Sequence, residues 1–151
     1  MAEAKKALEI SRVAGIAFQG PMILGTIARL AENPAIYRNA LAEAEALLAA
    51  GAVGHNYFWF YRDAIDVGLA YEDWALAERC ATALEVYTAS EPIVWADLII
   101  ARGRALAALG RGRSDRDLAM EIARLQGEAI RLGWQQAIPA LDRAVQALGA
   151  A

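Results

Sequence analysis

The sequence is poor in the residue types from which catalytic and metal sites are most often built. Among its 151 residues there is one histidine and one cysteine. Cys80 has no partner for a disulfide within the chain, which is typical of a reducing compartment, and we interpret it as a small buried residue of a helix. His55 has neither a nucleophile nor metal-ligand partners, so we expect a structural role at a helix start rather than acid–base chemistry.

Strand patterns, membrane spans and excess basic charge are also missing. No run of residues alternates between apolar and polar with a period of two, which argues against a sheet. The best apolar run, residues 93–100, contains Asp97 and is far shorter than the roughly 18–20 residues of a membrane span. The net charge of −3 and the pI of about 5.2 argue against a general nucleic-acid binder. Because the N-terminus has no apolar signal-peptide core, we expect a cytoplasmic location.

What the sequence has in excess is apolar residues, many of them alanine. Apolar residues make up 58% of the chain, compared with roughly 45–50% in a typical globular domain. Alanine is the best helix former and lets helices approach closely. The composition therefore predicts an all-α fold, and the length predicts a single domain over residues 1–151.

The chain is organised around residues 54–74, which contain most of its bulky aromatic side chains. Read as a helix, this stretch has two adjacent apolar stripes, which predict burial against two neighbours. The stripes comprise Phe58, Tyr61, Ile65 and Leu69 and, beside them, Tyr57, Phe60, Ala64 and Gly68. The remaining face carries His55, Trp59, Arg62 and Asp66, and the i, i+4 spacing of Arg62 and Asp66 predicts an ion pair along the helix.

Turn and cap residues divide the chain into seven or eight expected helices. Asn56 and Asp73 are expected to cap the helices that follow them, whereas Gly20 and Pro21 are expected to separate the first two helices. The expected helices cover residues 3–18, 21–31, 34–50, 57–71, 74–87, 92–109, 115–132 and 134–148. The arginine-containing loop at residues 110–114 would be able to meet a phosphate near the next helix start, but we favour a mobile connection.

The helices repeat as pairs. The pairs at residues 21–50, 54–89 and 92–132 start at intervals of about 35 residues, close to the 34-residue tetratricopeptide (TPR) unit of two antiparallel helices. The glycine usual at the turn of that unit is missing here, so the repeat is degenerate. We expect a TPR-like superhelical array in which residues 3–18 and 134–148 cap the two ends.

Four segments resemble a known family. They are HNYFWFYRDAI at residues 55–65, DWALAER at 73–79, EPIVWAD at 91–97 and IARGRAL at 100–106. With most of the chain from about residue 14 to 148, they resemble the C-terminal TPR-like region of bacterial proteins that join a class III adenylate/guanylate cyclase domain to an ATPase domain. The resemblance implies a regulatory or protein-interaction tail. The chain has no cyclase metal-carboxylate motif and no GxxxxGK[ST] phosphate loop, so neither parent activity is carried over.

Candidate binding residues lie on the first helix of two predicted pairs. In stacked helix pairs the first helices usually line the concave side, and aromatic and arginine side chains are enriched at binding hot spots. The predicted groove residues are Trp59, Arg62, Asp66, Trp95, Asp97 and Arg102. The competing interpretation is that the aromatic residues belong to the core and that Arg62 forms a structural ion pair with Asp66, Asp63 or Asp97.

We therefore expect a non-catalytic protein–protein interaction or regulatory scaffold module without cofactor or metal. Its expected partner is another protein or peptide, or a neighbouring domain of a larger signalling chain, and a homodimer is a further alternative. Neither nucleic acid nor membrane is an expected partner. The alternative function is a small-molecule-sensing domain in which the aromatic side chains around Trp59 and Trp95 enclose a pocket. A hydrolytic or transfer enzyme is the weakest alternative.

Overall fold

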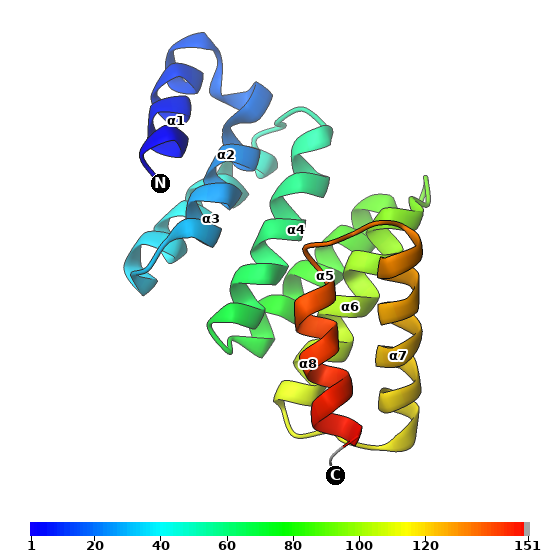
Figure 1. Ribbon diagram of the computed structural model, residues 1–151. Helices are drawn as coiled ribbons and strands as arrows, with labels where there is room; N and C mark the ends of the chain where they lie inside the picture. The colour runs from blue at the N-terminus through cyan, green and yellow to red at the C-terminus, as the bar shows by residue number, and fades with distance from the viewer. Residues whose placement is uncertain (150–151) are drawn as a thin grey trace. The chain divides into compact units, whose positions relative to one another are not determined.

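The computed structural model describes residues 1–149, which form eight α-helices and no strand (Figure 1). The helices are α1 (Ala2–Ala14), α2 (Ile16–Leu30), α3 (Pro34–Ala49), α4 (His55–Ala70), α5 (Trp74–Thr88), α6 (Val94–Gly110), α7 (Arg116–Arg131) and α8 (Ile138–Gly149). The all-α prediction is confirmed. In this described part of the chain, no helix is long and apolar enough to cross a membrane. The helices fall into two compact units, unit 1 (Met1–Tyr71) with α1–α4 and unit 2 (Glu72–Ala151) with α5–α8.

In unit 1, α2 packs on α1, α3 and α4. This helix is apolar around much of its circumference, and Leu24, Ile27 and Ala28 are buried. Gly25 faces α4, where an added β-carbon would lie 3.4 Å from the Cα atom of Phe60. Because glycine has no side chain, the backbones of α2 and α4 can approach closely at this point.

The predicted helix break at Gly20 and Pro21 is wrong. The break lies at Gly15, whose φ of 124° belongs to the region that glycine adopts most easily, and α2 continues through Pro21. A proline inside a helix removes the N–H that would bond to the carbonyl four residues earlier, here that of Ala17. The backbone N–H of Val53 donates to this carbonyl over 3.0 Å. The carbonyl of Ala17 therefore keeps a partner, and the helix accommodates its proline.

The side chain of Asn56 forms hydrogen bonds to the backbone of the same turn of α2. Its side-chain amide donates to the carbonyl oxygens of Ala17 at 3.3 Å and Phe18 at 3.0 Å, and its oxygen accepts from the N–H of Met22 at 3.3 Å. The side chain is fully buried. The prediction that Asn56 caps the aromatic helix is wrong, because α4 begins at His55 with no side-chain cap and Asn56 uses its polar atoms on α2.

In unit 2, α6 packs on α5 and α7, and α7 and α8 form an antiparallel hairpin (Figure 1). One apolar core joins α6, α7, α8 and the turn before α8. Its buried members are Leu98, Ala105, Leu118, Ile122, Leu125, Ala129, Ala137, Leu141 and Ala144. The core holds three helices together, and its members Ala105 and Leu118 also face the space between α5, α6 and α7.

The helix ends in unit 2 follow the sequence expectations in part. Asp73 caps α5 as predicted, since its carboxylate accepts from the N–H of Leu76 at 3.0 Å. The helix predicted from residue 92 begins at Val94. The helix predicted from residue 134 begins at Ile138, because residues 134–137 form a turn.

Two of the three predicted helix pairs pack as pairs. The helices α2 and α3, which cover residues 21–50, contact each other, and so do α6 and α7, which cover residues 92–132. The predicted pair at residues 54–89 joins α4 of unit 1 to α5 of unit 2. The superhelical array as a whole therefore stays a prediction.

Candidate interaction cleft

The predicted groove residues of unit 1 lie on α4. Trp59 is 38% exposed, and the guanidinium carbon of Arg62 lies 4.6 Å from the centre of its ring, so these two side chains stack. Asp66 is partly buried one turn further along α4. Of the carboxylates considered as ion-pair partners of Arg62, the structure shows Asp63 and not the i, i+4 neighbour Asp66. The Nε and Nη2 atoms of Arg62 donate to Asp63 at 3.0 and 2.7 Å.

Asp63 explains why the arginine turns away from Asp66. Its side chain is fully buried, and a buried carboxylate requires hydrogen-bond donors and a positive charge. Besides Arg62, the hydroxyl of Thr26 donates to it at 3.2 Å, and Nε of Arg29 lies 3.8 Å away. Since Thr26 and Arg29 belong to α2, this carboxylate ties α4 to α2. The sequence offers Asp63 only as one of three alternative partners of Arg62, because adjacent residues of a helix do not normally face one another.

In unit 2, two of the predicted groove residues contact Trp134, which was not among the predicted residues. Trp95, which is 38% exposed, packs edge to face on Trp134, with ring centres 5.8 Å apart. The guanidinium carbon of Arg102 lies 5.1 Å from the centre of the same Trp134 ring, and Arg102 is only 5% exposed. The indole of Trp134 thus joins Trp95 to Arg102. A single groove that also includes Trp59 and Arg62 stays a prediction.

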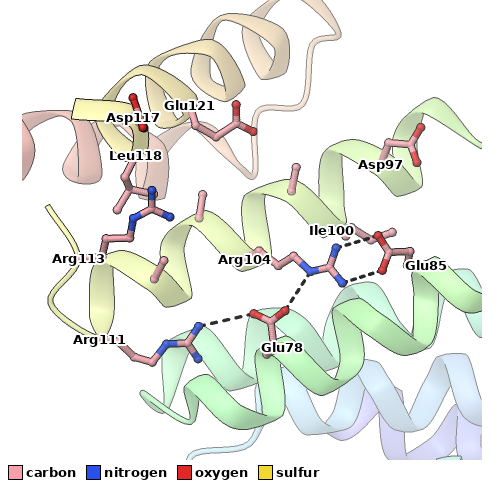
Figure 2. Close-up of a pocket in the computed structure, with 13 residues that line it drawn as sticks. Glu78, Glu85, Asp97, Ile100, Arg104, Arg111, Arg113, Asp117, Leu118 and Glu121 are labelled. Atoms are coloured by element: carbon pink, nitrogen blue, oxygen red, sulfur yellow. Dashed lines mark hydrogen bonds and ion pairs between the residues drawn. The ribbon is translucent and has the colours of Figure 1, made fainter. Parts of the chain in front are cut away.

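A cleft of about 720 Å³ opens between α5, α6 and α7 of unit 2 (Figure 2). Helix α6 forms its floor, α5 and α7 form its sides, and the loop from α6 to α7 lies at one end. The lining residues are Glu78, Glu85, Asp97, Ile100, Ala101, Arg104, Ala105, Ala108, Arg111, Arg113, Asp117, Leu118 and Glu121. Among the predicted groove residues, Asp97 is the one that lines this cleft.

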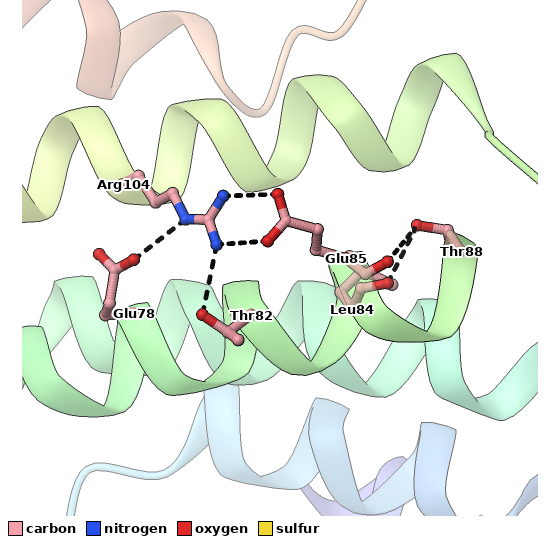
Figure 3. A network of polar contacts seen from close by, with 6 residues as sticks. All are labelled: Glu78, Thr82, Leu84, Glu85, Thr88 and Arg104. Carbon is pink, nitrogen blue, oxygen red and sulfur yellow. Dashed lines mark hydrogen bonds and ion pairs between the residues drawn. The ribbon is translucent and has the colours of Figure 1, made fainter. Parts of the chain in front are cut away.

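Arg104 is the most extensively bonded residue of the cleft (Figure 3). Its Nη1 and Nη2 atoms donate to the two carboxylate oxygens of Glu85 at 2.8 and 2.7 Å, and its Nε donates to Glu78 at 3.0 Å. Its Nη2 also donates to the hydroxyl of Thr82 at 3.2 Å. The hydrogen bonds and the positive charge of Arg104 lower the pKa of Glu85. This paired arrangement holds α6 against α5 at the rim of the cleft.

The two arginines of the loop also have carboxylate partners. Arg111 lies 3.6 Å from Glu78, and Arg113 pairs with Asp115 through two guanidinium nitrogens. The hydrogen bond from Arg113, together with the one from the N–H of Leu118, lowers the pKa of Asp115 to about 2. Because the carboxylate of Asp115 already caps α7, it occupies the position where a phosphate would meet this helix start.

Two carboxylates of the cleft remain without a cationic partner. Glu121 pairs with Arg124, which lowers the pKa of Glu121. Within residues 1–149, the carboxylates of Asp97 and Asp117 form neither an ion pair nor a side-chain hydrogen bond. Asp117 raises the pKa of Arg113 through space, but this effect is smaller than that of Asp115. The cleft therefore combines satisfied arginines with two unmatched negative charges.

The signal for this cleft is present in the sequence, although it was not recognised there. Asp97, Ala101, Ala105 and Ala108 follow one another at helical spacing and so share one face of α6. Only the placement of α5 and α7 on the two sides of this face shows that part of it lines an open cleft.

No known family model matches the chain, and no curated protein or solved structure matches it significantly. In the part of the chain that the structure describes, no group of three or more histidine, cysteine, aspartate or glutamate side chains is placed to hold a metal ion. The functional argument therefore depends on the cleft itself.

Proposed function

We propose that the chain is a non-catalytic protein-interaction module and that the cleft between α5, α6 and α7 holds a segment of another protein. The observation that carries this proposal is the lining of the cleft. Its floor presents Ala101, Ala105 and Ala108, small apolar side chains beside which a partner backbone can lie closely. Its rim carries charged side chains, and an apolar centre with a polar rim is the usual anatomy of a protein interface.

The finer description of the fold is part of the same proposal. The packing of α2 on α3 and of α6 on α7 supports a degenerate TPR-like array. The helices α2, α4 and α6 begin at Ile16, His55 and Val94, so the observed step is 39 residues (55 − 16 and 94 − 55) and not about 35. The resemblance of residues 55–65 and 91–106 to the tails of cyclase–ATPase proteins supports a regulatory role within a larger cytoplasmic signalling protein. In that setting the partner is either a separate protein or a neighbouring domain.

The small-molecule alternative has one observation in its favour. The cleft volume of about 720 Å³ falls within the roughly 300–1,000 Å³ of small-molecule sites. The lining contains no aromatic side chain, however, so this cleft is not the aromatic pocket expected around Trp59 and Trp95. Its charged and open rim fits a peptide better than a small apolar ligand.

An affinity capture from the lysate of the source cells tests the proposal. The parent chain is used as bait beside Ala101→Phe, which places a ring on the floor of the cleft, and beside Ala123→Phe on the exposed face of α7. We expect a protein that binds the parent and Ala123→Phe but not Ala101→Phe. The captured protein is then purified and its binding to the parent is measured directly.

Two further measurements complete the test. Circular dichroism must show that both variants keep their helices, since Ala101 also contacts the core of unit 2. An Arg62→Ala, Trp95→Ala variant tests the groove predicted from sequence. If the parent captures no protein, or if all variants capture the same protein equally, the interaction proposal fails for this cleft and the small-molecule alternative gains weight.

A further inference from the structure

We infer that the occupant of the cleft is a basic peptide segment, with lysine or arginine side chains at Asp97 and Asp117 and apolar side chains on the alanine floor of α6. This inference depends on the proposed function and adds the chemistry of the partner to it. It follows from the charges that the cleft leaves unmatched.

The arginines of the cleft do not attract an acidic partner strongly, because each already has a carboxylate. Arg104 donates four hydrogen bonds to Glu78, Glu85 and Thr82. Arg111 and Arg113 lie against Glu78 and Asp115. An acidic peptide or a phosphate would have to compete with these carboxylates for the arginines, which reduces its gain on binding.

The lining of the cleft contains more carboxylates than arginines. Five carboxylates and three arginines line the cleft, so negative charge is in excess. Asp97 and Asp117 are both exposed, so a cationic side chain can reach them without displacing an existing partner. A lysine or arginine of a peptide would therefore gain an ion pair at each position, and such complementarity also favours fast association.

The positions of the two aspartates define the length of the segment. In Figure 2, Asp97 lies near one end of α6 and Asp117 lies beside Arg113 at the other. The floor from Asp97 to Ala108 covers about 16 Å at the helical rise of 1.5 Å per residue. This distance corresponds to about five residues of an extended peptide or about eleven residues of a helical one.

The test uses two labelled probes that differ only in charge. The first is a 14-residue amphipathic peptide of alanine, leucine and lysine, and the second has glutamate at every lysine position. Their binding to the full chain is followed by fluorescence anisotropy at low and at moderate salt. We expect saturable binding of the lysine peptide that weakens with salt, and at least about tenfold weaker binding of the glutamate peptide.

Matched variants separate the cleft from the general acidity of the chain. Asp97→Asn, Asp117→Asn removes both unmatched charges, whereas Glu32→Gln, Glu91→Gln removes two exposed charges elsewhere. Two half-exposed ion pairs together change affinity by about three- to tenfold. We expect the first variant to bind the lysine peptide that much more weakly and the second to bind it like the parent.

The outcomes that overturn the inference differ from those that overturn the proposed function. Equal binding of both peptides, equal losses in both double variants, or no saturable binding overturns the inferred basic partner. If a peptide still binds and Ala101→Phe prevents it, the cleft remains an interaction site of other chemistry. If Ala101→Phe has no effect on any peptide or captured protein, the proposed function fails as well. A dimer that Asp97→Asn, Asp117→Asn abolishes would replace the basic peptide by a second copy of the chain.

Discussion

Asp63 in unit 1 and Glu85 in unit 2 each accept two hydrogen bonds from one arginine, but their surroundings differ. The side chain of Asp63 is 0% exposed and that of Glu85 is 54% exposed. A buried carboxylate that loses its arginine leaves an uncompensated charge, whereas an exposed one is rehydrated. The network of unit 1 is therefore part of the fold, and the network of unit 2 shapes the rim of a cleft.

The apolar cores show the same contrast. In unit 1 a buried amide, that of Asn56, bonds to backbone groups of α2 beside a proline. In unit 2 the core of α6, α7 and α8 consists of apolar side chains, and most of the charged side chains line the cleft or lie on the surface. Unit 1 thus adds specific buried polar contacts to its apolar core, while unit 2 keeps most of its charged side chains at the surface.

The largest predicted effect is that of Asp63→Ala. It removes the carboxylate partner of Arg62 and one of the two acceptors of Thr26, so we expect a loss of about 3 kcal/mol in the free energy of unfolding. Urea denaturation gives the free energy, and hydrogen exchange locates the loss, which should be larger in α2 and α4 than in α7 and α8.

Glu85→Ala is the matched control at the surface. It also removes the partner of an arginine, but Arg104 keeps Glu78, Thr82 and water as acceptors. We expect a much smaller change in the free energy of unfolding. Equal destabilisation by the two variants would contradict the division between an interior network and a rim network.

The second largest predicted effect is that of Asn56→Ala, for which we expect a loss of about 2 kcal/mol in the free energy of unfolding. The substitution removes the hydrogen bonds of this side chain to the carbonyl of Phe18 and to the N–H of Met22. Pro21→Ala restores a helical N–H donor for the carbonyl of Ala17, to which the amide of Asn56 also donates. In the Pro21→Ala background, Asn56→Ala should therefore cost less.

A double-mutant cycle in urea measures this dependence. Strictly additive losses would show that Asn56 does not compensate for Pro21. In that case the polar contacts of unit 1 would be ordinary buried hydrogen bonds rather than a repair of one helix turn.

The sequence predicts those parts of the fold that local patterns determine. Helical periodicity and caps such as Asp73 place most helices within a few residues of their observed bounds. The capping rule is local and does not predict the role of Asn56, because most of its partners lie on α2, up to 39 residues away along the chain, and only Val53 is near it in sequence. Pro21 was mistaken for a break for the same reason, since its compensating contacts come from a distant segment.

The candidate site was harder to predict than the fold. Helix spacing favours Asp66 among the possible partners of Arg62, but the burial of Asp63 decides the choice of partner. Asp97 was selected and does line the cleft, whereas Trp95 and Arg102 contact Trp134. A cleft made by three helices cannot be read from the periodicity of any one of them, because each helix contributes only one side.

The smallest predicted effect is on the stability of the chain at low pH, and it comes from Asp115 in unit 2. The pKa of Asp115 is lowered from 3.8 to about 2 by Arg113 and by the N–H of Leu118. A carboxyl group with a lower pKa in the folded state stabilises that state above the unfolded pKa, and this contribution is lost as the pH falls from about 4 to about 2.

Asp115→Asn keeps an oxygen that can cap α7 but removes the charge. Thermal unfolding from pH 5 to pH 2 should therefore show a shallower fall in Tm for the variant than for the parent. Because the group is exposed, the difference should be modest and should shrink in high salt. Identical slopes would show that the pair of Arg113 and Asp115 positions the loop at the end of the cleft without stabilising the fold, which would make unit 2 still more dependent on its apolar core.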